Sequence, residues 1–118
     1  MMRFGIRYKQ RDILLIPIPF TDLKSIRKRP VVVISNDSYN DKTDDIIVVG
    51  LTSNITSKEF SILISNDDLE EGTLKYQSQI RVDRIYSISQ SIVVKRFGKL
   101  NKETFEKIIN ILQKLIKQ

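Results

Sequence analysis

The chain has 118 residues, of which 41% are hydrophobic and 29% charged, as is typical of a single globular domain with a modest core. It contains neither histidine nor cysteine, which excludes disulfides, thiolate zinc sites, cysteine nucleophiles and any mechanism built on a histidine base. Twenty Lys and Arg residues against fourteen Asp and Glu give a net charge of +6, which favours polyanionic partners.

The first segments are a basic lead-in over residues 1–11 and a strand over residues 12–20, which is rich in Ile and Leu. Pro17 and Pro19 have no N–H to donate to a neighbouring strand, so this end of the strand is predicted to be an edge or an exit. The apolar runs are too short to span a bilayer, and the N-terminus lacks the pattern of a signal peptide. We therefore expect a cytoplasmic protein with no membrane partner.

The middle of the chain predicts further strands joined by polar connections. Residues 30–35 form a continuous β-branched run, which is typical of a strand buried on both faces. Alternation and composition predict the remaining segments as a polar loop at 21–28, a turn-rich connection at 36–45 with room for a helical turn, strands at 46–52, 59–65 and 78–87, an acidic loop at 66–76, an ambiguous stretch at 89–97 and a break at Gly98.

The C-terminal segment, residues 101–117, is predicted to be an amphipathic helix. Asn101 is a favourable N-cap, and Glu103 places a carboxylate in the first turn, where it suits the helix dipole. Apolar residues then recur at helical spacing, at Phe105, Ile108, Ile109, Leu112, Leu115 and Ile116. Short strands followed by one helix predict a single mainly-β or α+β domain over residues 1–118, a compact antiparallel barrel with helical cover.

The residue types that remain for catalysis are arginine, hydroxyl and carboxylate groups. Acidic pairs such as Asp44-Asp45 and Asp67-Asp68 are interpreted as solvated loop charges, so neither a metal nor another cofactor is predicted. A guanidinium matches the geometry of a phosphate, and a neighbouring hydroxyl adds an aimed hydrogen bond. Arg29 and Thr52 are the candidates, although on sequence alone Arg29 also fits an exposed cation before a strand, and Thr52 a strand end that bonds local backbone.

Several motifs, and the order in which they follow one another along the chain, resemble those of the MazF/PemK family, the toxins of prokaryotic toxin–antitoxin pairs. The resemblance runs from about Asp12 to the C-terminal helix. It rests on Lys28-Arg29-Pro30 before Val31-Val32-Val33-Ile34, on Leu51-Thr52-Ser53-Asn54, on the Pro19-Phe20-Thr21-Asp22-Leu23 loop, on Ser78-Gln79-Ile80 and on Gly98-Lys99-Leu100, which matches a turn before the last helix.

The resemblance implies an SH3-like barrel, usually a homodimer, that cleaves single-stranded RNA. It implies that Arg29 is the catalytic cation and that Thr52 acts at the scissile phosphate. Phe20 then either stacks on a base or caps the core, and Ser78 either contacts RNA or stabilises its strand. The predicted RNA-binding residues are Phe20, Thr21, Lys24, Arg27, Lys28, Ser53, Ser78 and Arg84.

The chemistry implied is attack by the RNA 2′-hydroxyl without a metal, leaving a 2′,3′-cyclic phosphate and a 5′-hydroxyl. The implied protein partner is a cognate antitoxin with an acidic tail. The sequence departs from the family where Arg11 replaces a glycine and where Arg84-Ile85-Tyr86 replaces a glutamine-containing segment, so base preference does not transfer. Two alternatives stay open: a non-catalytic toxin that acts on a protein such as DNA gyrase, as CcdB-like barrels do, and a nucleic-acid-binding barrel without activity.

Overall fold

The structure is a computed structural model that describes residues 7–19, 26–56 and 59–118. Among these residues no helix is both long and apolar enough to cross a bilayer. In chain order the elements are β1 (Asp12–Pro19), β2 (Ile26–Val33), α1 (Asp37–Lys42), β3 (Asp45–Thr52), β4 (Ser61–Ile64), the short 3-10 helix η1 (Asn66–Asp68), β5 (Leu69–Gly72), β6 (Ser78–Ser89), the 3-10 helix η2 (Gln90–Ile92), β7 (Lys95–Leu100) and α2 (Lys102–Ile116).

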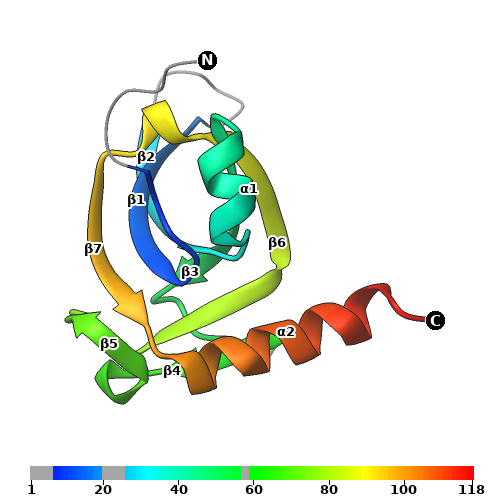
Figure 1. The fold of residues 1–118 in the computed structure, drawn as a ribbon. Coiled ribbons are helices and arrows are strands. Elements are labelled where there is room, and N and C mark those ends of the chain that lie inside the picture. The colour runs from blue at the N-terminus through cyan, green and yellow to red at the C-terminus, as the bar shows by residue number, and fades with distance from the viewer. Residues whose placement is uncertain (1–6, 20–25, 57–58) are drawn as a thin grey trace.

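The seven strands form one antiparallel sheet in the order β4-β6-β3-β2-β1-β7-β5. The sheet curls into a half-barrel, with α1 packed against β3 and α2 running beneath β4 and β6 (Figure 1). This architecture confirms the predicted mainly-β fold with a C-terminal helix. The helix begins after the predicted N-cap, because the Asn101 side chain accepts a hydrogen bond from the Thr104 N–H at 2.8 Å.

The strand β2 is buried on both faces at residues 31–33, as the β-branched run predicted. Consecutive residues Val31, Val32 and Val33 are all fully buried, and they belong alternately to two apolar clusters. One cluster includes Leu14, Ile16, Val31, Val33, Ile46 and Val48, and the other joins Ile13, Val32, Val49, Leu51 and Ile80 to Phe105 and Ile108 of α2. The central strands are therefore held firmly from both sides.

The strand β2 begins earlier than predicted, at Ile26, so Arg27 and Lys28 lie in a strand rather than in a loop. They pair with the proline-containing end of β1, where Lys28 lies opposite Pro17. Among the residues that the structure describes, β7 pairs only with residues 12–15 of β1. The proline end therefore pairs with β2 alone and is an edge, as predicted. Arg27 and Lys28 are exposed, which explains why no apolar pattern marked this part of the strand.

Two predictions about glycine-containing segments were wrong. The acidic segment predicted as a loop contains η1 and the strand β5, and Gly98 lies inside β7 rather than breaking it. Gly72 and Gly98 lie opposite each other where β5 pairs with β7. A Cβ atom at Gly72 would come within 2.3 Å of the Phe97 carbonyl oxygen, so glycine here permits two strands to approach closely.

Candidate active site

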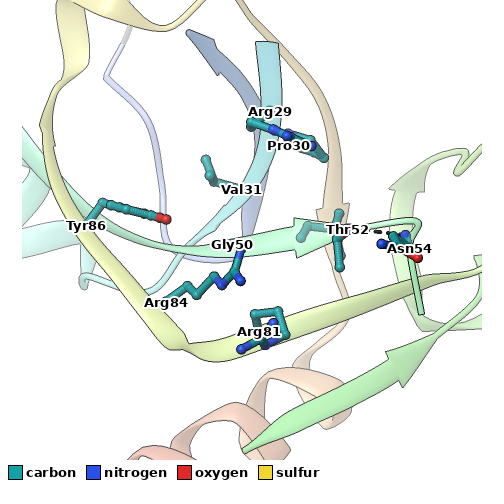
Figure 2. Close-up of a pocket in the computed structure, with 10 residues that line it drawn as sticks. Arg29, Pro30, Val31, Gly50, Thr52, Asn54, Arg81, Arg84 and Tyr86 are labelled. Carbon is teal, nitrogen blue, oxygen red and sulfur yellow. Dashed lines mark hydrogen bonds between the residues drawn. The ribbon is translucent and has the colours of Figure 1, made fainter. Parts of the chain in front are cut away.

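Arg29 and Thr52 lie on the same face of neighbouring strands. Val31 of β2 pairs with Gly50 of β3, and each candidate lies two residues away from its member of that pair. Because side chains two apart along a strand share a face, Arg29 and Thr52 project to the same side. Both line one cavity of about 250 Å³ (Figure 2). The structure thus brings the two sequence-predicted candidates together.

The backbone around Arg29 is fixed by its position in the sheet. Arg29 pairs with Ile16 of β1 on one side and is followed by Pro30, whose ring restricts both residues to extended conformations. Val31, one residue further on, is completely buried. The Arg29 side chain is half-buried. A guanidinium in this setting is anchored at its base, and part of it remains accessible to a ligand.

The Thr52 hydroxyl has a defined orientation at the end of β3. Its Oγ1 accepts a hydrogen bond from the Asn54 N–H at 3.0 Å (Figure 2). This is the local backbone contact that sequence considerations alone allowed. Because a hydroxyl is also a donor, its hydrogen remains able to bond a group in the cavity. Thr52 and Asn54 both line that cavity.

A second hollow, of about 370 Å³, is lined in part by the same residues. Arg29, Pro30, Leu51, Thr52 and Asn54 line both hollows. The second hollow also takes in the side chains of Lys28, Ser53, Leu74, Lys75, Tyr76, Ser78 and Phe97. Arg29 and Thr52 therefore border both hollows, an arrangement that suits a chain-like ligand extending along them.

The remaining wall of the first cavity comes from β6 and was not fully anticipated. Arg84 was a predicted site residue, and the structure adds Arg81 and Tyr86 (Figure 2). Val49 pairs with Ile85 while the adjacent Gly50 pairs with Arg81, so residues 82–84 form a bulge in β6. Bulges re-aim side chains, and the strand alternation seen in the sequence does not reveal them.

Asp83, in the bulge, is a carboxylate that has to be considered as a general base. Its carboxylate receives two hydrogen bonds from Arg81, with Nε–Oδ1 at 3.1 Å and Nη2–Oδ2 at 3.2 Å. This contact, with smaller contributions from the charges of Arg81 and Arg84, lowers the pKa of Asp83 despite partial desolvation. A lowered pKa makes the carboxylate a weaker base, so the geometry argues against that role for Asp83.

The two hollows are strongly cationic. Among the residues that the structure describes, Arg29, Arg81 and Arg84 line the first hollow, Lys28 and Lys75 line the second, and no Asp or Glu lines either. Within the same ranges no group of three or more acidic, histidine or cysteine side chains could hold a metal ion. The arrangement can neutralise and hydrogen-bond an anion such as a phosphodiester.

Among the described residues, Arg27 and Ser78 are placed less centrally than Arg29 and Thr52. Phe20, Thr21 and Lys24 lie outside the described residues, and Arg27 is exposed and lines neither hollow. Ser78 lines the second hollow, but it is 6% exposed and its hydroxyl donates to the Tyr76 carbonyl at 2.9 Å. That contact favours the strand-stabilising alternative for Ser78. The roles of the predicted site residues in RNA binding stay predictions.

Several solved structures share this fold. An endoribonuclease in complex with its cognate antitoxin from a mycobacterial species has a TM-score of 0.75 and 16% identity, over 91% of this chain and 92% of that one. A chain of the MazE–MazF complex from Deinococcus radiodurans has a TM-score of 0.77 and 14% identity, over 94% and 97%. The Mycobacterium tuberculosis toxin MazF-mt6 has a TM-score of 0.71 and 13% identity, over 88% and 94%. At these identities the likeness establishes the fold alone.

The family is established by a match over almost the whole chain. The model of the PemK-like, MazF-like toxins of type II toxin–antitoxin systems matches residues 9–116. This chain therefore belongs to the PemK/MazF toxin family. None of the curated proteins compared with the chain matches it.

Proposed function

We propose that the protein is an endoribonuclease toxin that cleaves single-stranded RNA without a metal. Membership of the PemK/MazF family supports an RNA-cleaving toxin, and structures with the same fold include endoribonucleases. The observation that carries the proposal is the placement of the Arg29 guanidinium and the Thr52 hydroxyl on one face, lining one cationic cavity. Those groups suit charge stabilisation at a phosphoryl centre.

In the proposed reaction the RNA supplies its own nucleophile. The 2′-oxygen forms a bond to the adjacent phosphorus while the bond to the 5′-oxygen breaks, giving a 2′,3′-cyclic phosphate and a 5′-hydroxyl. The 2′-hydroxyl loses its proton to a base that we do not assign, and the leaving 5′-oxygen gains one. Arg29 stabilises the charge on the phosphoryl oxygens and is proposed to donate the second proton, while Thr52 hydrogen-bonds a phosphate oxygen.

The proposed biological context follows from this activity. Cleavage of messenger RNA in the cytoplasm inhibits translation and growth. The partner is a cognate antitoxin whose acidic, partly disordered tail competes with RNA for the cationic hollows. The active form is proposed to be a homodimer.

The chemistry is tested with purified, antitoxin-free protein and mixed-sequence single-stranded RNA in excess EDTA. We expect discrete cuts whose products carry cyclic-phosphate and 5′-hydroxyl ends, read by mass spectrometry. A matched RNA with 2′-fluoro groups at every position should not be cut, because it has no nucleophile. Cutting of the 2′-fluoro RNA, or activity that EDTA abolishes, would contradict the proposed reaction. The absence of any cutting by folded protein would direct attention to protein targets.

A further inference from the structure

The β6 wall of the cavity carries charge to which the proposed cleavage step assigns no role. Arg29 and Thr52 come from β2 and β3, whereas Arg81 and Arg84 come from the bulged part of β6 on the opposite side of the cavity (Figure 2). One phosphodiester at Arg29 and Thr52 does not account for two further guanidiniums. The wall can therefore bind a further group of the ligand.

The Arg84 side chain crosses the backbone of β3 at Gly50, where the absence of a side chain leaves room for it. A Cβ atom built on Gly50 would lie 3.6 Å from the Arg84 Cβ and 3.9 Å from its Cδ, so the side chain passes directly over Gly50. Figure 2 shows it extending from β6 toward β3. Within the described ranges its guanidinium makes no hydrogen bond or ion pair that would satisfy its donors, and its charge acts electrostatically on Asp83. Its donor fork is thus available to a ligand.

Arg81, in contrast, is held in place. Its side chain is only 13% exposed, and the two hydrogen bonds that it donates to the Asp83 carboxylate, at 3.1 and 3.2 Å, fix the guanidinium. Asp83 also offsets one of the two positive charges of the wall. The positive charge of Arg84 therefore has no carboxylate partner among the described residues, whereas Arg81 is held in a fixed position beside it.

We propose that Arg84, supported by Arg81, binds a second phosphodiester of the RNA, one that flanks the scissile phosphate. This inference rests on the proposed function, because it assumes an RNA strand lying across Arg29 and Thr52. A phosphodiester fits best because it offers a charge and two acceptor oxygens to a planar donor fork. The exocyclic amino groups of adenine and cytosine would instead place donors against guanidiniums, which is unfavourable.

The proposal is tested by the salt dependence of binding to mixed-sequence 2′-fluoro single-stranded RNA, which cannot be cleaved through a 2′-hydroxyl. Each neutralised phosphate of a single strand adds about 0.7 to the slope of log affinity against log salt. For Arg84→Ala we expect that slope to decrease by about 0.7, and binding at low salt to weaken about tenfold. The loss should be similar for RNAs of different base composition.

Two matched variants distinguish a specific contribution of Arg84 from a general effect of positive charge on RNA binding. Arg84→Lys keeps the charge but not the fork, so we expect the slope to be kept and affinity to decrease by less than in Arg84→Ala. Lys107 is an exposed cation of α2 that lines neither hollow, and Lys107→Ala should leave the slope unchanged. Circular dichroism shows whether each variant is folded, and Arg84→Lys keeps the test valid if the alanine variant is not.

Three results would overturn the inference. In the first, the Arg84→Ala slope equals that of the wild type. In the second, the effect of Arg84→Ala depends on the base, for example on guanine alone, which would make Arg84 a base reader. In the third, the wild-type protein does not bind the RNA. Because binding is measured on uncleavable RNA, a protein that shows the predicted slopes but does not cut natural RNA refutes the nuclease and keeps the phosphate subsite.

Discussion

At the scale of single residues, the site depends on where strand alternation places two side chains. Arg29 and Thr52 could be predicted because short motifs mark them and because both lie in regular strands, in which side chains two apart share a face. Arg81 and Tyr86 could not be predicted, since the bulge at residues 82–84 shifts the register of β6 against β3. Predicting the face of each side chain from its position in the sequence assumes an unbroken strand register, and this assumption fails at a bulge.

Arg11 has a backbone conformation that favours glycine, the residue the family often has there. Its φ is +79°, while its Nη1 donates to the Leu100 carbonyl at 2.9 Å and to Glu70 at 3.2 Å. Arg11→Ala loses both contacts and keeps the strain, whereas Arg11→Gly loses the contacts and relieves it. We therefore expect Arg11→Gly to be more stable than Arg11→Ala by about 1 kcal/mol in urea unfolding. Equal stability would show that the backbone is not strained.

The lowered pKa of Asp83 predicts a contribution to the pH dependence of stability. The cause is the hydrogen-bonded ion pair with Arg81. A carboxyl group whose pKa is lower in the folded than in the unfolded state stabilises the fold above its unfolded pKa, and that contribution disappears as the pH falls through the folded pKa. Asp83→Asn should therefore lose less stability than the wild type between about pH 6 and about pH 2.5 in urea unfolding. Parallel profiles for the two proteins would contradict the prediction.

At the scale of elements, the errors of prediction lie where strands are short and glycine-containing. β5 has four residues of which only Leu69 is apolar, so neither alternation nor composition marks it as a strand. It forms because the edge of β7 is available and because Gly72 and Gly98 allow the two backbones to approach. The long buried strands and α2 were predictable because their apolar faces recur with a clear period.

Gly72 is expected to be the glycine least tolerant of substitution among those that the structure describes. It has a φ of +86°, and a Cβ atom there would meet the Phe97 carbonyl oxygen at 2.3 Å. Gly72→Ala should destabilise the protein by about 2 kcal/mol or more in urea unfolding. The control is Gly50→Ala, because a Cβ at Gly50 has its nearest contact at an ordinary 3.6 Å. A similar loss in both variants would mean that the close β5–β7 approach is not the cause.

At the scale of the whole molecule, the half-barrel brings distant segments to one face. Residues from β2, β3 and β6 line the first hollow, and residues that follow β3 or precede β6, together with β7, complete the second. The clustering of positive side chains could be anticipated only in part from the net charge of +6, because charge in a sequence says little about which strands become neighbours. The order of family motifs carried most of the functional prediction, and the sheet topology supplied the rest of the site.

The most direct test of the account is the rate of RNA cleavage by Arg29→Ala, Thr52→Ala and the double variant, measured in EDTA under single-turnover conditions. If both groups act on one phosphate, each single variant should lose at least about a hundredfold in rate. The double variant should then lose less than the product of the two single losses, because the groups act as a unit. Circular dichroism and urea unfolding must show native folding for all three. Wild-type rates in a folded Arg29→Ala variant would contradict the central claim that Arg29 and Thr52 form the active site.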